Sequence, residues 1–447
     1  MKAIIRNTKN VKGAVRVPGD KSISHRSLIF GAMAEGETVI KNFLMADDCL
    51  RTMEGLRSAG THIAESGGSI YVTGKRKIFN EPENVIYCGN SGTTMRLLAG
   101  LFASQPFYTV MSGDNSLSSR PMGRIVEPLV RMGAGLFGRK ENRYPPLAIR
   151  GNTLHGINYR MPVASAQVKS SIIIAALSAG GTTIVEEPIL SRDHTERILI
   201  SFGGKLEKEG LSIMVPGNQN LRGIEIEIPG DFSSAAYFMA AAAMVKNSCI
   251  RIEKVGLNPT RTGFAKVLTR MGAGVSIFNE SQEGMEPVGD IEVSGSGRLK
   301  GVEILPCEVP GVIDEIPLLA TVASMAEGRT LISGASELKL KESDRLLAIS
   351  TELNKMGSDI STTDDGLIIN GVEKLSGTKV ESWGDHRIAM SLAIAALAAE
   401  GETIVNDFDC VNISFPSFPS IMSECGPEIV LVKDKKEPPL KGDSHVH

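Results

Sequence analysis

Six stretches of the chain are apolar on nearly every face, and a loop of small and polar residues precedes each one. They begin at Pro18, Gly89, Val163, Pro229, Val312 and Trp383, and they read PGDKSISHRSLIFGAMA, GNSGTTMRLLAGLFA, VASAQVKSSIIIAALSA, PGDFSSAAYFMAAAAM, VIDEIPLLATVASMA and WGDHRIAMSLAIAALAAE. A helix that is apolar all round belongs in the interior of a protein. The pattern therefore predicts six buried helices, each entered through a polar loop.

The residues that follow each stretch repeat as well. A β-branched segment comes next, such as GETVIKN after the first stretch, and then an amphipathic segment such as DDCLRTMEGLRSAG. The unit recurs roughly every 70 to 80 residues, as in repeat architectures. Three buried helices with sheets outside them would make one domain, so six units predict two similar α/β domains.

The boundaries of these domains follow from a motif that occurs twice in the sequence. PGDFSS at Pro229 resembles PGDKSIS at Pro18, which places a second start near Pro229. The N-terminal strand AIIRN…GAVRVPG has no partner within its own half of the chain, so we expect it to complete the domain formed by the other half. The predicted domains are residues 1–19 with 229–447, and residues 20–228, with a hinge near 19–20 and 228–229. The charged, proline-containing end from about 433 to 447 is expected to be a loose tail.

Composition and charge exclude several classes of protein. The 447 residues carry a net charge of -3, which does not suit a nucleic-acid or membrane surface. Six isolated cysteines without a C-x-x-C pair argue against a zinc or dithiol site and fit a reducing compartment. The longest apolar run, Ile172–Ala179, is too short to cross a bilayer, and the N-terminus has no signal-peptide pattern. We therefore expect a cytoplasmic protein without nucleic-acid or membrane partners.

The polar loops carry groups that bind anions. The N-terminus of a helix presents free N–H groups and the positive end of its dipole, and both favour phosphate. The loops and one further segment add the following residues: Lys21, Ser22, Arg26, Asn90, Ser91, Gly92, Thr93, Ser165, Gln167, Lys169, Lys341, Arg345 and Arg387. Few of these cations have an acidic neighbour in the sequence. We therefore expect a phosphorylated ligand to be their partner.

Two acidic residues stand among these cations. Asp314 lies in a loop equivalent to the cationic loops, and Glu342 lies beside Lys341 on a segment predicted to be helical. A carboxylate next to a bound phosphate can act as a general base or acid. Alternatively, Asp314 or Glu315 only caps the next helix. His386 either relays a proton or is a structural residue, and the sequence leaves both interpretations open.

Eight motifs occur in order from residue 18 to residue 391: PGDKSISHR, GNSGTTMRL, SRPM, SAQVKS, SRDHTE, IDEIP, KESDRL and DHRIAMS. In this order they closely resemble the 5-enolpyruvylshikimate-3-phosphate synthase family over nearly the whole chain. The resemblance implies two domains of three βαβαββ repeats each, an inside-out α/β barrel that closes over its substrates. It implies transfer of the enolpyruvyl group from phosphoenolpyruvate to the 5-hydroxyl of shikimate 3-phosphate in aromatic amino acid biosynthesis. It also implies a monomer without metal or organic cofactor, and glyphosate as an inhibitor.

The resemblance also assigns roles to residues. It implies that shikimate 3-phosphate is bound by Lys21, Ser22, Arg26, Ser165, Gln167, Arg192, Asp314 and Lys341. It implies that phosphoenolpyruvate is bound by Lys21, Gly92, Arg120, Gln167, Arg345 and Arg387. Lys21 is implied to be catalytic. Asp314 would accept the proton of the 5-hydroxyl, and Glu342 would protonate the methylene carbon of phosphoenolpyruvate.

The chain departs from the usual family pattern at two places. Many members have Ser-Ser-Gln where this chain has Ser165, Ala166 and Gln167, which fits the second, more divergent class. Many also carry a lysine where this chain has Ile413. One rival is the enolpyruvyl transferase that acts on UDP-N-acetylglucosamine, but its loop cysteine is missing here after Ser112. Another is a non-catalytic phosphometabolite-binding protein, in which acidic groups such as Asp314 would only weaken binding.

Overall fold

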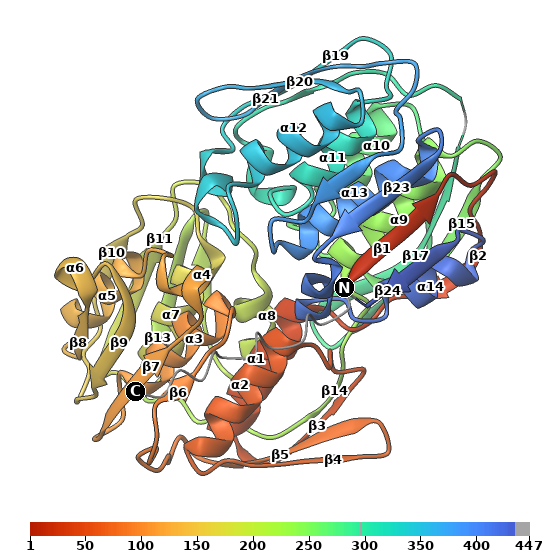
Figure 1. Ribbon diagram of the computed structural model, residues 1–447. Coiled ribbons are helices and arrows are strands. Elements are labelled where there is room, and N and C mark those ends of the chain that lie inside the picture. Colours follow the sequence, from red (N-terminus) through yellow and green to blue (C-terminus); the bar gives the residue numbers. More distant parts are fainter. Residues whose placement is uncertain (296, 434–447) are drawn as a thin grey trace, which may run out of the picture.

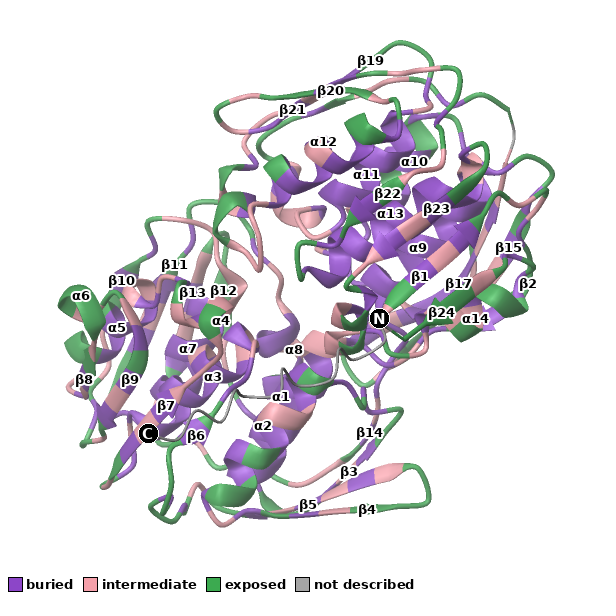
Figure 2. Ribbon diagram, viewed as in Figure 1, coloured by how far each residue is buried: buried purple, intermediate pink, exposed green. Residues whose placement is uncertain are grey.

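The computed structural model describes residues 1–295 and 297–433. The predicted loose tail therefore lies, except for Lys433, outside the described residues. The six apolar stretches are helices, as the pattern predicts, and Figure 2 shows them largely buried between the sheets. These helices are α1 (Lys21–Met33), α3 (Gly92–Phe102), α7 (Ala166–Ala176), α9 (Phe232–Met244), α11 (Ile316–Ala323) and α13 (His386–Ala398).

The loops before these helices supply capping side chains. Asp20, Ser91, Ser165, Asp231 and Asp385 each accept a hydrogen bond from a backbone N–H in the first turn. At α11 the capping residue, Glu315, makes no such bond. The interpretation that Asp314 or Glu315 serves to cap this helix is therefore wrong. Asp314 is left with its carboxylate available for other partners.

Three four-stranded sheets come from residues 35–227. In each, the first two strands are parallel and the remaining pairs are antiparallel. In their order within each sheet, the strands are β14 (Glu225–Glu227), β3 (Glu35–Lys41), β5 (Ser69–Lys75) and β4 (His62–Ser66); β6 (Ile86–Tyr87), β7 (Tyr108–Ser112), β9 (Tyr144–Arg150) and β8 (Gly135–Gly138); and β10 (Asn158–Arg160), β11 (Thr182–Glu186), β13 (Ser212–Pro216) and β12 (Glu207–Glu209).

Three further sheets combine the N-terminus with residues 249–432, and in each the first two strands are again parallel. In order, their strands are β2 (Lys12–Arg16), β15 (Cys249–Gly256), β17 (Glu286–Ser294) and β16 (Gly274–Glu283); β18 (Glu303–Ile304), β19 (Arg329–Ile332), β21 (Leu367–Asn370) and β20 (Asp359–Thr362); and β22 (Lys379–Glu381), β23 (Glu402–Asn406), β1 (Lys2–Arg6) and β24 (Ile429–Val432). The N-terminal segment forms two strands in different sheets, not the single strand expected, and both pair with strands of the C-terminal half as predicted.

Parallel neighbours need a crossover connection, and the buried helices provide it. Four of them join the two parallel strands of one sheet directly, as α3 joins β6 to β7. At α1 and α9 the chain instead changes halves. The strand before α1, β2, pairs with β15, and the strand before α9, β14, pairs with β3. The first turns of α1 and α9 thus lie where the chain crosses between the halves.

The amphipathic segments are helices as well, and the last of them, after β23, was not singled out in the sequence. They are α2 (Asp47–Ser58), α5 (Gly123–Arg131), α8 (His194–Ser201), α10 (Gly263–Arg270), α12 (Arg345–Lys355) and α14 (Phe418–Glu424). Single helical turns are α4 (Asn115–Ser118) and α6 (Arg139–Asn142), and 3-10 turns are η1 (Val309–Gly311), η2 (Ser336–Leu340) and η3 (Phe408–Ile413). None of the helices in the described ranges is long and apolar enough to span a membrane.

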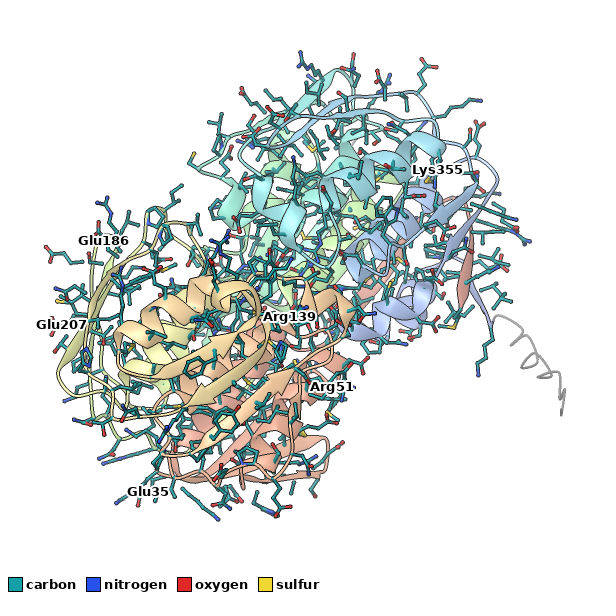
Figure 3. All side chains as sticks on the ribbon, turned by 60° about the vertical axis from the view of Figure 1, so that its left-hand side comes forward. Glu35, Arg51, Arg139, Glu186, Glu207 and Lys355 are labelled. Atoms are coloured by element: carbon teal, nitrogen blue, oxygen red, sulfur yellow. The ribbon has the colours of Figure 1, made fainter. Side chains whose placement is uncertain are left out.

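The buried apolar side chains form two separate clusters. One draws on residues 23–228, and the other on residues 3–17 and 232–425. Figure 1 shows the corresponding elements as two groups, one from red-orange to yellow-green, and one from green to blue that also contains the red N-terminal strands β1 and β2. Charged side chains such as Glu186 and Glu207 project outward from the outer sheets (Figure 3). The molecule is a mixed α/β fold of small sheets around buried helices.

Buried polar contacts connect the two groups near the chain crossings. Arg261 donates to Asp20 at 3.0 Å, and the backbone N–H of Lys21 donates to Asp231 at 3.0 Å. His194 and Glu286 lie 2.7 Å apart between ring nitrogen and carboxylate oxygen. These contacts hold the start of α1, and with it Lys21, at the junction of the two halves.

Candidate active site

A cavity of about 490 Å³ is lined by residues from both halves. The cationic residues that line it are Lys21, Arg96, Arg120, Arg124, Arg192, Lys341, Arg345 and Arg387. The carboxylates that line it are Asp48, Asp314, Glu337 and Glu342. This is an excess of positive charge in a partly enclosed space, which suits ligands with several negative charges.

Helix N-termini supply much of the wall. Lys21 and Ser22 open α1, Gly92 opens α3, Gln167 lies in the first turn of α7, and Arg387 in that of α13. The four helices come from both halves, and their buried bodies hold these first turns rigidly. Their N–H groups and dipoles add to the positive potential of the side chains.

Asp314 is the carboxylate with the most cationic surroundings. Its oxygens lie 2.7 Å from Arg192, 3.4 Å from Arg387 and 3.5 Å from Arg345. Burial alone would raise the pKa of Asp314, but the attraction of these guanidinium groups outweighs it and holds the pKa well below 3.8. Asp314 is therefore an anion at neutral pH, able to accept a proton.

Glu342 lies on the opposite side of Arg345. One carboxylate oxygen is 2.5 Å from Arg345 and the other is 3.5 Å from Arg120 of the other half. Burial works to raise the pKa of Glu342, and Arg345 and Arg120 more than offset it, so the pKa lies well below 4.5. The expectation that Lys341 and Glu342 come from a helix is wrong, because both lie in the loop between η2 and α12.

His386 is fully buried behind Arg387 at the start of α13. Neither ring nitrogen has a hydrogen-bond partner among the described residues. Burial, together with the charges of Lys21 and Arg387, lowers the pKa of His386 well below 6.5. The imidazole is therefore neutral at pH 7 in this state.

Several of the cations that lack acidic neighbours in the sequence have acidic partners in the fold. Lys21 pairs with Asp48 at 3.0 Å, and the attraction of Asp48 raises the pKa of Lys21 despite the opposing effect of burial. Arg345 pairs with Asp385 at 2.7 Å as well as with Glu342. These partners are 27 and 40 residues away in sequence, so a search among near neighbours could not find them.

Lys169 does not line the cavity, although we expected it to bind an anion. Its side chain is completely buried and lies 2.9 Å from Glu187 and 2.7 Å from Glu196. Arg26 is likewise not among the lining residues. Its guanidinium donates to Thr195 at 2.6 Å, to Ser170 at 2.7 Å and to the carbonyl of Ser22 at 2.8 Å. Asn90, Ser91 and His386 are not among the lining residues either. The predicted residues that do line the cavity are Lys21, Ser22, Gly92, Thr93, Arg120, Ser165, Gln167, Arg192, Asp314, Lys341, Glu342, Arg345 and Arg387.

Four charged lining residues were missed in the sequence: Asp48, Arg96, Arg124 and Glu337. Arg96 donates to Gln167, and no carboxylate of the described residues lies within salt-bridge distance of it. Burial lowers the pKa of Arg96 to about 10, which still leaves it charged at pH 7. Arg124 and Glu337 form a bidentate pair of 2.6 and 2.9 Å across the two halves. Of these four, Arg96 could have been predicted from the sequence, because it lies four residues after Gly92 and therefore on the same face of the helix.

The described residues contain no group of three or more His, Cys, Asp or Glu side chains placed to hold a metal ion. What the arrangement can do is bind two anions side by side and move protons at Asp314 and Glu342. The two carboxylates stand on either side of Arg345, within the same cation-rich space.

Comparison with known proteins agrees with this chemistry. Residues 5–422 match the family model described as EPSP synthase (3-phosphoshikimate 1-carboxyvinyltransferase). The chain is 48% identical over 419 residues to the 3-phosphoshikimate 1-carboxyvinyltransferase of Brevibacillus brevis, with 94% of this chain and 98% of that protein covered. It is 49% identical over 425 residues to the protein of the same name from Thermodesulfovibrio yellowstonii, with 94% and 99% covered. A solved EPSP synthase from Acinetobacter baumannii superposes with a TM-score of 0.85 at 43% identity and covers 96% of this chain and 99% of its own.

Proposed function

The chain belongs to the EPSP synthase family, and from that premise we propose which of its side chains carry out the reaction. The enzyme transfers the enolpyruvyl group from phosphoenolpyruvate to the 5-hydroxyl of shikimate 3-phosphate and releases phosphate, a step of the shikimate pathway. One observation carries the assignment of roles. Asp314, a largely shielded carboxylate, is surrounded by guanidinium groups from both halves inside a cavity of about 490 Å³.

We assign the binding of shikimate 3-phosphate to the wall formed by α1 and α7 together with two further cations. The residues of this set are Lys21, Ser22, Arg26, Ser165, Gln167, Arg192, Asp314 and Lys341. All but Arg26 line the cavity, which supports direct contact. Arg26 would contribute by holding the carbonyl of Ser22 at 2.8 Å, and its direct contact with the substrate stays a prediction.

Phosphoenolpyruvate is assigned to a set that shares two residues with the first: Lys21, Gly92, Arg120, Gln167, Arg345 and Arg387. Two observations support adding Arg96 to this set. It has no acidic partner among the described residues, and its guanidinium lies beside Gly92. Arginine binds carboxylate and phosphate in a bidentate manner, so this group can hold both charged ends of the substrate.

Asp314 is proposed as the base of the reaction. A proton added to the methylene carbon makes the neighbouring carbon electrophilic, and the 5-hydroxyl then adds to it while Asp314 accepts the hydroxyl proton. The resulting tetrahedral intermediate loses a proton from its new methyl group and releases phosphate, which restores the double bond. The guanidinium groups around Asp314 and Glu342 stabilise the negative charges throughout.

Glu342 is proposed to protonate the methylene carbon. In the ligand-free protein it is ionised, because Arg345 and Arg120 hold it in that form. Bound phosphoenolpyruvate would take over the same two arginines. Glu342 would then lie beside an anion without its compensating cations, which raises its pKa and protonates it. Binding of phosphoenolpyruvate would thus convert Glu342 into the acid that protonates the substrate.

We propose that the two apolar clusters are two domains, residues 1–19 with 229–447 and residues 20–228, each an inside-out barrel of three repeats. The chain crossings at 19–20 and 228–229 would be the hinge, and closure would exclude water from the reaction. We further propose that the enzyme is a cytoplasmic monomer inhibited by glyphosate. All six cysteines are unpaired, which supports a reducing compartment.

Charge reversal at Arg124 tests whether the pair with Glu337 holds the closed form. Arg124→Glu places two carboxylates opposite each other, which costs several kcal/mol at an interface. We expect at least about a tenfold rise in KM for both substrates. The double variant Arg124→Glu/Glu337→Arg restores an ion pair of opposite polarity and should regain most of the loss in steady-state kinetics. Absence of any recovery would show that the pair does not hold the two halves together.

Gly92→Ala tests the proposed position of phosphoenolpyruvate. The added Cβ would lie 2.9 Å from a guanidinium nitrogen of Arg96 and 3.5 Å from one of Arg120. Both are flexible ends, so the variant should fold, but the arginines must rotate away. A rotamer distortion costs about 0.5–1.5 kcal/mol, which corresponds to a two- to tenfold rise in KM for phosphoenolpyruvate. The KM for shikimate 3-phosphate should stay the same. Unchanged KM values for both substrates would show that phosphoenolpyruvate does not bind next to Gly92.

A phosphate-release assay with purified enzyme tests the activity itself. Release is expected only when phosphoenolpyruvate and shikimate 3-phosphate are both present. Replacing the acceptor by UDP-N-acetylglucosamine should give no phosphate above the background. Turnover with UDP-N-acetylglucosamine in place of shikimate 3-phosphate would overturn the assignment of the acceptor.

A further inference from the structure

Lys169, Glu187 and Glu196 form a buried ion cluster behind the wall proposed to bind shikimate 3-phosphate. The side chains of Lys169 and Glu187 are wholly shielded from solvent, and that of Glu196 is 5% exposed. The ammonium group lies 2.9 Å from Glu187 and 2.7 Å from Glu196. Buried charges are costly to maintain, so a cluster of three that contacts no substrate calls for a reason.

The two glutamates differ in their other contacts. The second carboxylate oxygen of Glu187 accepts a hydrogen bond from the backbone N–H of Ser191 at 3.2 Å and another from the Ser191 hydroxyl. The ammonium group of Lys169 also reaches the carbonyl of Ser191 at 3.5 Å. Both oxygens of Glu196, in contrast, lack a hydrogen-bond partner among the described residues apart from the ion pair. Lys169 and Glu187 therefore hold a loop residue, whereas Glu196 contributes only its charge, to Lys169 and to the nearby Arg26.

The loop residue they hold is next to Arg192. Ser191 and Arg192 both line the cavity, between the end of β11 and the start of α8. Arg192 reaches across to Asp314 of the other half at 2.7 Å, and its second terminal nitrogen is buried without a hydrogen-bond partner in the described ranges. A long side chain on an irregular loop would otherwise lose much of its conformational freedom on binding a ligand.

We propose that Lys169 and Glu187 are positioning residues that hold Ser191 and Arg192 in place for shikimate 3-phosphate. This inference rests on the proposed role of Arg192 as a ligand of that substrate. Lys169 lies on α7, the helix whose first turn carries Gln167, so the same element orders two parts of one binding wall. The simpler alternative is that the ion cluster only packs α7 against α8, and it predicts a loss of stability without a selective kinetic effect.

The test is a double-mutant cycle between Glu187→Gln and Arg192→Ala. Glu187→Gln keeps the side-chain size but weakens the hold on Ser191. We expect kcat/KM for shikimate 3-phosphate to fall about tenfold, the size of one hydrogen bond to a charged group. The KM for phosphoenolpyruvate should be unchanged. Since both variants disturb the same contact, their effects should not add, and the double variant should resemble Arg192→Ala alone.

Glu196→Gln is the matched control, because it removes a charge from the same lysine without touching Ser191. It should leave kcat/KM for shikimate 3-phosphate near the parent value, with thermal unfolding measured alongside. If Glu187→Gln does not fold, Glu187→Asp keeps the charge but shortens the reach to Ser191, and the same loss is expected. Additive effects, or an equal loss in Glu196→Gln, would overturn the proposal. If Arg192→Ala itself leaves kcat/KM unchanged, the proposed role of Arg192 fails and the positioning role falls with it.

Discussion

Asp314→Ala is expected to lower kcat about 10²- to 10⁴-fold, the usual contribution of a general base. The dissociation constants of both substrates should change little. Asp314 is one of the residues assigned to shikimate 3-phosphate, but its removal also frees Arg192 and Arg387 for the substrates, so binding should weaken far less than turnover. Phosphate release measures kcat, and isothermal titration calorimetry measures the two dissociation constants. Losses of equal size in kcat and in binding would make Asp314 a binding residue only.

Glu315 offers a control at the neighbouring position. It is a buried carboxylate that accepts a hydrogen bond from Ser233, and it is not among the residues that line the cavity. Glu315→Gln removes a charge that lies 3.7 Å from Arg387, much as Asp314 lies 3.4 Å from it, so general effects on folding or on the field of the cavity should be similar. Its kcat should stay close to that of the parent enzyme. A fall as large as that of Asp314→Ala would point to electrostatics of the region and not to proton transfer.

The pKa of Asp314 also predicts how the rate depends on pH. A group whose pKa is lowered in the folded protein is ionised above that lowered value. Since the pKa of Asp314 lies well below 3.8, its protonation should produce no acid limb in the pH profile of the free enzyme at or above pH 3.8. An acid limb at higher pH must come from another group or from the substrates.

The repeated pattern of apolar and polar segments was enough to predict six buried helices and the strands after them, because burial and local preference agree in these segments. The pattern could not predict strands whose position depends on pairing with distant parts of the chain. AIIRN and GAVRVPG read as one N-terminal strand, yet each finds a different sheet of the C-terminal half. The first becomes an inner strand between β23 and β24, and the second an edge strand beside β15. No local signal in the sequence shows these pairings.

The site could be predicted in part, and helical geometry explains the failures. Gln167 and Lys169 are two residues apart on α7, so they face opposite sides, and only Gln167 reaches the cavity. Gly92 and Arg96 are four apart on α3 and share a face, so Arg96 belongs with the site although we selected only residues 90–93 of that segment as candidates. Because we considered the loops without the helix face that continues from them, we included Lys169 wrongly and omitted Arg96.

Long-range charge pairing was invisible for a different reason. Asp48, Glu337 and Asp385 neutralise cations that come from other elements of the fold. The free enzyme therefore holds its arginines in ion pairs that the substrates must replace. Anion binding is then an exchange of partners, in which the freed carboxylates change their pKa. Glu342 is where this exchange has the largest chemical consequence.

Glu342→Gln should lower kcat about 10²- to 10⁴-fold and should also abolish a proton uptake that accompanies ligand binding. Glu342 is ionised in the free enzyme, because Arg345 and Arg120 hold its pKa well below 4.5 against the effect of burial. When phosphoenolpyruvate takes these arginines in the presence of shikimate 3-phosphate, the pKa of Glu342 rises and the complex takes up about one proton. Calorimetric titrations in buffers of different ionisation enthalpy measure this number.

Comparison of variants separates Glu342 from the other groups that titrate on binding. The substrates and every remaining side chain are common to the parent and to Glu342→Gln, so the difference in proton uptake belongs to Glu342. Glu337→Gln is the control, since Glu337 is also a lining carboxylate paired with an arginine, and its uptake should equal that of the parent. Equal uptake in the parent and in Glu342→Gln would mean that Glu342 stays ionised in the complex. The proton for the methylene carbon would then have to come from another donor, and Glu342 would act only through its charge.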